Sequence, residues 1–164
     1  NKKRIIAIGE VGMDFKEDLK EHDRQRKIFS KFIELSIELN KPIIVHSRKA
    51  EIECIELLEK LNAKKVIMHC FCGNRKLVER IIANKWYLTI PTSVKSSQQF
   101  QDNAKIVPIN QLFCETDSPY LHPDKLKNNE PVNVIVSYEK IAEVKKIKLA
   151  EVKNIIFENY DKIF

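Results

Sequence analysis

The sequence predicts an α/β fold built on a parallel sheet. Short apolar runs alternate with segments of helical period along the chain, and no internal repeat or low-complexity stretch interrupts them. Five runs are continuous and bounded by polar or turn residues, as buried parallel strands are. This succession fits a doubly wound sheet as well as a barrel, because both are built from right-handed strand-helix-strand units. The five runs cover residues 5–9, 42–46, 66–69, 87–90 and 112–115.

Apolar residues recur at helical spacing between the early strands and again after the last one. Each helix is expected to place its apolar face against the sheet, because parallel strands need crossover connections that cover it. The first such segment has Phe29, Phe32, Ile33 and Ile37 on one face. The other segments cover residues 54–61, 77–82, 134–142 and 152–163.

Length and composition indicate one domain over residues 1–164, because 43% hydrophobic residues can build a single packed core. The longest apolar runs are only of strand length, so we expect no membrane span. The chain begins with the basic residues at positions 2–4, and the acidic Glu10 and Asp14 that soon follow argue against a secretory signal. We therefore expect a cytoplasmic protein.

The net charge of +6 suits a polyanionic partner such as nucleic acid, although lysine enrichment can equally reflect genome composition.

Several side chains that bind metals in other proteins are expected to be structural here. The cysteines show no spacing typical of a secreted disulfide framework, so we expect reduced, partly buried thiols. His22 lies among charged residues and is expected to be solvated. The four cysteines are Cys54, Cys70, Cys72 and Cys114.

Four other side chains fall at the ends of predicted strands. Glu10 follows the first run, His46 ends the second, His69 ends the third and Asp117 follows the last. In a parallel barrel the carboxyl ends of the strands converge on one face, so these side chains would meet there. A single histidine or acid at a strand end is more often structural. Four of them at the same end of four of the five strands predict a centre for zinc, manganese or another divalent ion.

These residues lie in motifs that resemble those of the TatD-like metal-dependent DNases, a family of the amidohydrolase-type barrel superfamily. The resemblance covers essentially the whole chain and keeps the family's order and spacing. It implies a TIM-type (β/α) barrel that cleaves phosphodiester bonds of DNA with a metal-activated water. The matching motifs are Gly9–Asp14, Ile44–Arg48, His69–Gly73, Glu115–Pro119 and Asn129–Pro131.

The resemblance further implies two divalent ions, Mg, Mn or Zn, at one site. Glu10 would bridge them, His46 and His69 would complete one ion, and Asp117 would bind the other. The family's second ion also takes an N-terminal His-x-His, which this sequence does not contain, so one ion is expected to be lost here.

We therefore expect an N-terminally truncated barrel with about five parallel strands, the C-terminal two-thirds of the family domain, and an exposed sheet edge. A fragment of a longer protein is the favoured explanation. Upstream residues that are not included here are a second explanation, and self-association of a shortened protein through that edge is a third.

The resemblance implies roles for individual residues. Asp117 is the predicted catalytic residue, because a carboxylate that touches metal and water can orient or deprotonate that water. Glu115 would hold a ligand histidine in the required tautomer. Arg48, Lys95 and His122 are the predicted DNA contacts, and the Arg48 guanidinium has the geometry to bind phosphate with two hydrogen bonds.

The loops carry further candidates. Phe71 and Tyr120 would either stack on a splayed base or anchor their loops. Asn129 with Pro131 is expected to fix the Pro-rich loop over residues 119–131, called the late loop below. Two other functions stay open for the whole chain. The first is hydrolysis of small esters or amides, because the same barrel and ligands support that chemistry. The second is an inactive truncated binding module.

Overall fold

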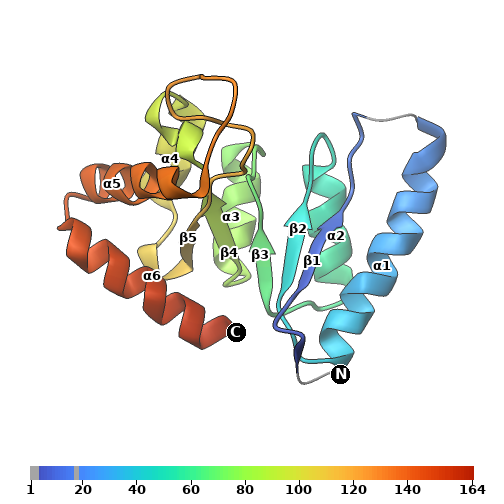
Figure 1. The fold of residues 1–164 in the computed structure, drawn as a ribbon. Helices are drawn as coiled ribbons and strands as arrows, with labels where there is room; N and C mark the ends of the chain where they lie inside the picture. The colour runs from blue at the N-terminus through green and yellow to red at the C-terminus, as the bar shows by residue number, and fades with distance from the viewer. Residues whose placement is uncertain (1–3, 17–18) are drawn as a thin grey trace. The chain divides into compact units, whose positions relative to one another are not determined.

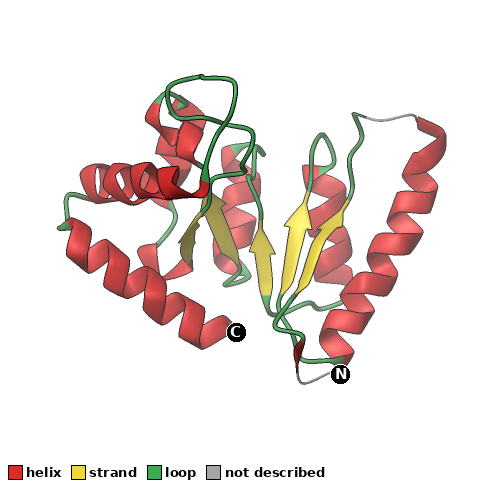
Figure 2. Cartoon of the chain, viewed as in Figure 1, coloured by secondary structure: helices red, strands yellow, loops and turns green. Residues whose placement is uncertain are grey.

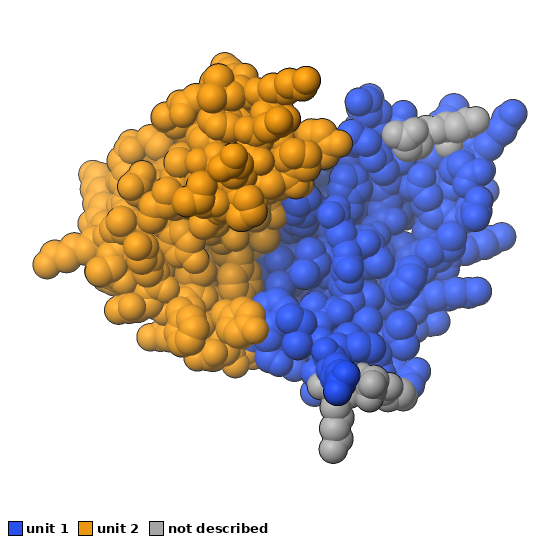
Figure 3. Space-filling view, viewed as in Figure 1, with its two compact units in different colours: residues 1–87, 163–164 blue, residues 88–162 orange. Residues whose placement is uncertain are grey.

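The computed structural model describes residues 4–16 and 19–164, which form two compact units (Figure 3). Unit 1 comprises residues 1–87 with 163–164, and unit 2 comprises residues 88–162. In each unit, helices alternate with parallel strands (Figure 1, Figure 2). The predicted α/β class is therefore confirmed, whereas a single domain over residues 1–164 stays a prediction. None of the helices in the described part of the chain has the length and apolar character needed to cross a bilayer.

Unit 1 holds three parallel strands, each followed by a helix (Figure 1). β1 pairs with β2, and β2 pairs with β3, so the strand order within the unit follows the chain. A short 3-10 turn, Leu19–Glu21, precedes the first helix. The elements are β1 (Ile8–Gly12), α1 (His22–Glu38), β2 (Ile43–His46), α2 (Glu51–Lys60), β3 (Val66–Met68) and α3 (Arg75–Ala83).

Strand β2 shows how the unit divides its two faces. Ile43 and Val45 are buried, whereas the residues between and after them are only partly buried. Because successive side chains of a strand point to opposite faces, this alternation places His46 on the face opposite Ile43 and Val45. Phe29 and Ile33, one turn apart on α1, are also fully buried. Burial of each such apolar side chain contributes roughly 1.5–3 kcal/mol to the free energy of folding.

The first strand begins later than predicted. Residues 5–9 form the apolar run, but β1 spans Ile8–Gly12, and Ile5 and Ile6 are exposed. The reason is the partner strand. The amide of Ile8 donates to the carbonyl of Pro42 at 2.8 Å, directly before β2 begins, so earlier residues extend beyond the ladder.

His22 departs from the prediction that it is solvated. It begins α1 with only 9% of its surface exposed, and its ring stacks on Phe15 with centroids 3.8 Å apart. The charged neighbours Glu21 and Asp23 instead pair with arginines on the exposed surface. Helical rotation separates His22 from residues adjacent in sequence, so the polarity of those neighbours did not predict its burial.

Unit 2 holds two parallel strands and three helices. β4 and β5 pair with Leu88 opposite Leu112 and Ile90 opposite Cys114. The buried amide of Asn159 donates to the carbonyl of Leu112 at 2.9 Å and so fixes the last helix to the start of β5. The elements are β4 (Tyr87–Ile90), α4 (Gln98–Ile106), β5 (Leu112–Cys114), α5 (Val134–Lys145) and α6 (Leu149–Ile163), with 3-10 turns at Thr92–Lys95, Ile109–Gln111 and Pro131–Asn133.

Helix α4 was missed by the sequence analysis. Its sequence is mostly polar, and only Phe100 and Ala104 supply a buried apolar pair at helical spacing. The start is nevertheless marked by Ser97, whose hydroxyl accepts from the amide of Phe100 at 3.5 Å. A helix of nine residues with two core positions is too short for hydrophobic period to reveal.

Gly12 lets β1 and β2 approach closely at the end of the ladder. It lies opposite His46 and has a φ of 148°, a conformation that L side chains rarely adopt. A Cβ added there would lie 1.9 Å from the carbonyl oxygen of His46. Only glycine fits this position without moving the backbone that carries His46.

We expect Gly12→Ala to lower the free energy of unfolding by at least about 2 kcal/mol, because the methyl group forces apart two hydrogen-bonded strands. Urea unfolding followed by circular dichroism measures the change. Lys31→Ala, on the exposed face of α1, is the control and should shift the free energy by less than about 0.5 kcal/mol. Equal stability of Gly12→Ala and wild type would contradict the steric argument.

Candidate metal centre

Three of the predicted ligands meet in unit 1. Glu10 lies in β1, His46 ends β2 and His69 follows β3 directly. Their ligand atoms all lie within 4.8 Å of one another. Oε1 of Glu10 is 2.9 Å from Nδ1 of His46 and 3.6 Å from Nε2 of His69. The structure thus brings these three side chains to a common point, as the positions at strand ends predict.

The parallel ladder explains why the three meet. The amide of Met13 donates to the carbonyl of His46 at 3.0 Å, and the amide of His69 donates to the carbonyl of Val45 at 3.0 Å. The ends of the three strands are therefore held side by side by backbone hydrogen bonds. β1 has a register irregularity between Ile8 and Val11, the segment that contains Glu10. Such irregularities redirect a side chain at the end of a strand.

The donor set and its spacing fit one divalent ion. Ligand atoms that lie about 2.0–2.2 Å from one ion are about 2.8–3.6 Å apart when adjacent in octahedral or tetrahedral geometry. The two contacts of Glu10, at 2.9 and 3.6 Å, agree with that spacing. Two imidazoles and a carboxylate suit zinc, manganese or iron, and three protein ligands leave coordination positions for water or substrate. The Glu10 and His46 side chains are 48% and 32% exposed, so the ligand set is accessible from solvent.

A second carboxylate lies on the other side of His46. Oδ2 of Asp14 is 3.3 Å from Nε2 of His46. Nε of Arg48 donates to both oxygens of Asp14, at 3.0 and 2.8 Å, and the Nη2 group of Arg48 also bonds to Oδ2. The hydrogen bond from Arg48 is the main reason that the pKa of Asp14 falls to about 2, and burial partly opposes it.

Asp14 was not predicted from the sequence as a functional residue. Its place at the end of the Gly9–Asp14 motif was the signal that could have found it. Arg48 was predicted to contact phosphate, and the structure places its guanidinium on Asp14. That Arg48 also contacts DNA stays a prediction.

Asp117 belongs to unit 2, where it follows β5. Its φ of 57° is left-handed, and its carbonyl accepts from the amide of Tyr120 at 2.8 Å in a tight turn. Its neighbour Glu115 extends the sheet, because the Glu115 amide donates to the carbonyl of Ile90 at 3.1 Å. That Asp117 joins the metal centre, and that Glu115 orients a ligand, stay predictions.

The predicted DNA contacts of unit 2 lie beside one acidic residue. Lys95 forms an ion pair with Asp124, and its hydrogen bond is the main reason that the pKa of Asp124 is lowered. Nδ1 of His122 accepts from the amide of Asp124 at 3.0 Å. Lys95 and His122 are therefore neighbours within this unit, and their contact with DNA stays a prediction.

Asn129 fixes the late loop, as predicted. Its buried Nδ2 group donates to Oγ1 of Thr92 at 2.9 Å and to the carbonyl of Thr116 at 2.8 Å. The hydroxyl of Thr92 donates in turn to the carbonyl of Leu121 at 2.6 Å.

The two aromatic candidates differ, because Phe71 is buried and anchors its loop in unit 1, whereas Tyr120 is exposed.

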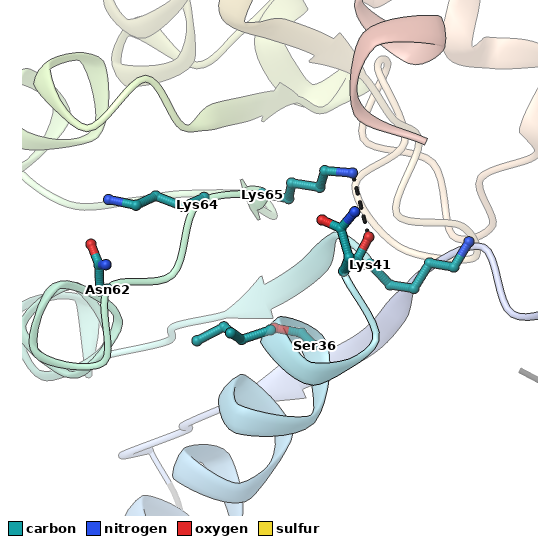
Figure 4. Close-up of a pocket in the computed structure, with 7 residues that line it drawn as sticks. Ser36, Lys41, Asn62, Lys64 and Lys65 are labelled. Carbon is teal, nitrogen blue, oxygen red and sulfur yellow. Dashed lines mark hydrogen bonds between the residues drawn. The ribbon is translucent and has the colours of Figure 1, made fainter.

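A hollow in unit 1 lies away from this centre (Figure 4). Its lining includes Lys41, two residues before β2, and Lys65, directly before β3, so it lies at the amino ends of the strands whose carboxyl ends carry the histidines. Nζ of Lys65 donates to the carbonyl of Asn40, just after α1, at 3.4 Å. Lysines near helix carboxyl ends commonly donate to the last carbonyls of the helix in this way, so the presence of Lys65 in the hollow has a structural explanation.

Comparisons with known proteins agree with the motifs. A family model described as TatD related DNase matches residues 1–164. The chain is 38% identical over 164 residues to an uncharacterized metal-dependent hydrolase of Methanocaldococcus jannaschii, covering 100% of this chain and 64% of that protein. It is 38% identical over 167 residues to deoxyribonuclease TATDN3 of Homo sapiens, covering 99% of this chain and 61% of that protein. The chain thus spans about three-fifths of the length of these relatives.

A solved structure shows the same fold. The TatD homologue YjjV of Escherichia coli superposes with a TM-score of 0.92 at 20% identity, over 99% of this chain and 66% of that one. The α/β fold with five parallel strands and six helices is therefore that of TatD-type TIM-barrel proteins, as predicted. With a family model that matches the full sequence and relatives at 38% identity, the chain belongs to the TatD-related DNase family.

Proposed function

We propose that this chain carries the metal-binding part of a metal-dependent deoxyribonuclease, in which Glu10, His46 and His69 hold a divalent ion. The observation that carries the proposal is the meeting of their ligand atoms within 4.8 Å of one another, with Oε1 of Glu10 at 2.9 and 3.6 Å from the two imidazoles. When bound, such an ion lowers the pKa of a coordinated water and stabilises charge on phosphoryl oxygens. We propose Mg, Mn or Zn as the ion, and a second ion beside it once further ligands are supplied.

Two observations favour DNA as the substrate. A human relative at 38% identity is named a deoxyribonuclease. The net charge of +6 also favours encounter with a polyanion. A small ester or amide would not need that charge, so we place DNA first and keep the small substrates as outcomes of the test.

The chain's own residues have distinct roles in this proposal. Asp117 orients the attacking water and accepts its proton, because a carboxylate within hydrogen-bond reach of that water can act as general base. Arg48 and Lys95 bind phosphate oxygens, and His122 contacts the substrate beside Lys95. The Lys95–Asp124 pair is exposed, so exchanging Asp124 for a phosphate costs little free energy.

A cytoplasmic location is also part of the proposal. None of the four cysteines, all in the described part of the chain, is in a disulfide, as expected for a reducing compartment. Burial raises the pKa of Cys54 to about 12, so this thiol stays protonated and unreactive at neutral pH.

We expect Glu10→Gln to weaken binding of Mn²⁺ by about 100-fold or more, because the substitution keeps the size of the side chain and removes the charge that faces both imidazoles. Isothermal titration calorimetry measures the dissociation constant. Glu79→Gln is the matched control, since Glu79 lies exposed on α3, where it pairs with Arg75. Similar dissociation constants for Glu10→Gln and Glu79→Gln would rule out the proposed site.

We expect the full chain to release nucleotides from single-stranded or duplex DNA in the presence of Mg²⁺ or Mn²⁺, and EDTA to stop the reaction. Asp117→Asn should lower kcat by about 100-fold or more, the usual contribution of a general base. Asp161→Asn, on the exposed side of α6, should leave kcat unchanged. Turnover of small esters or amides without DNA cleavage would replace the proposal, and metal-loaded protein that binds DNA without cutting it would indicate a binding module.

A further inference from the structure

We propose that Asp14 is a positioning residue that fixes the tautomer and the ring orientation of His46, and that Arg48 holds Asp14 in place for this task. The inference rests on the proposed binding of a metal ion by His46. It does not depend on DNA being the substrate.

The two ring nitrogens of His46 face two different carboxylates. Nδ1 lies 2.9 Å from Oε1 of Glu10, on the side of the candidate ligands, and Nε2 lies 3.3 Å from Oδ2 of Asp14, on the other side. A neutral imidazole binds a metal through the nitrogen that carries no proton, so its proton must stay on the other nitrogen. A carboxylate is an acceptor only, and Asp14 therefore favours the tautomer with the proton on Nε2 and a lone pair on Nδ1.

Asp14 is itself held from several directions. Arg48 donates through Nε to both carboxylate oxygens, and the amide of Lys16 donates to Oδ1 at 3.0 Å. The backbone of Asp14 is fixed to α1, because its amide donates to Oε1 of Gln25 at 2.7 Å and its carbonyl accepts from Nε2 of Gln25 at 3.2 Å. The carboxylate thus has little freedom to turn away from His46.

The backbone places Arg48 opposite Asp14. Beyond the ends of β1 and β2 the two chains continue side by side, and the amide of Phe15 donates to the carbonyl of Arg48 at 2.9 Å. The Asp14 side chain is 20% exposed, which shields its hydrogen bonds from solvent more than those of a surface ion pair. Asp14, Arg48 and His46 therefore form one connected group at the end of a single strand pair.

A purely structural ion pair is the competing explanation, and unit 1 offers a matched control for it. Glu59 of α2 pairs with Arg80 of α3, with Nε of Arg80 at 3.2 Å from Oε1 of Glu59 and Nη2 at 2.6 Å from Oε2. Both side chains are about one-third exposed, and the further partner of Glu59 is the side-chain amide of Asn84 rather than a histidine. Glu59→Ala removes the same kind of pair from helices that carry none of the ligands.

We expect Asp14→Ala to weaken binding of Mn²⁺ by about 10-fold to 100-fold, the usual effect of removing a group that orients a ligand histidine. Asp14→Asn should recover part of the affinity, because its Oδ1 still accepts a hydrogen bond from Nε2. Glu59→Ala should leave the dissociation constant within about twofold of wild type, since it alters no partner of a ligand. Calorimetric titration with Mn²⁺ and the thermal midpoint of the metal-free protein are measured for all four chains.

A second measurement needs no variant and protects the test if Asp14→Ala does not fold. Long-range ¹H–¹⁵N correlation spectra of the Zn²⁺-loaded wild type report which nitrogen of His46 carries the proton. We expect protonated Nε2 and a metal-shifted Nδ1. A proton on Nδ1 would overturn the proposal, and so would Asp14→Ala with wild-type affinity or with the same loss as Glu59→Ala.

The outcome separates this proposal from the previous one. A wild-type chain that binds neither Mn²⁺ nor Zn²⁺ overturns the metal site and the role of Asp14 together. A wild-type chain that binds the ion, shows the expected tautomer and fails to cut DNA overturns the nuclease alone.

Discussion

The parallel ladder between β1 and β2 is the constraint on which the candidate site depends. It begins where Ile8 bonds to Pro42, continues with Met13 bonded to His46, and extends past the strands to Phe15 bonded to Arg48. Side chains along this one seam supply a candidate metal ligand from each strand and the carboxylate behind one imidazole. A shift of one residue in that register would turn each of these side chains to the opposite face. Gly12 is required at the same seam because no other residue permits such a close approach.

The sequence predicted the triad but not its support. Glu10, His46 and His69 lie at or near the ends of apolar strands, and parallel topology alone implies that such ends share one edge. Asp14 and Arg48 lie beyond their strands, where the hydrophobic pattern has stopped. Their pairing depends on backbone bonds that continue after the apolar run, and no local pattern reports those bonds.

The other departures have equally local causes. The polar helix α4 is recognisable only by its cap and two core residues, and His22 is buried because the helix turns it onto Phe15. Asn129 was predicted correctly as the residue that fixes the late loop, since a buried amide can bond to several carbonyls and hydroxyls at once. Sequence patterns thus predicted the five strands and the strand ends at which candidate ligands meet, whereas helix α4 and the hydrogen-bonded surroundings of each side chain needed the structure.

Two of the arginine–carboxylate pairs of unit 1, Arg48 with Asp14 and Arg80 with Glu59, differ in position rather than in kind. In both pairs the arginine guanidinium donates to the carboxylate through the same kind of nitrogen atoms. Partly exposed pairs of this kind add little to stability, because water and salt screen the charges. The pair at Asp14 differs in one contact, the approach of its carboxylate to Nε2 of His46. A modest interaction at that atom decides which nitrogen is available to an ion, so its effect on metal affinity exceeds its effect on folding.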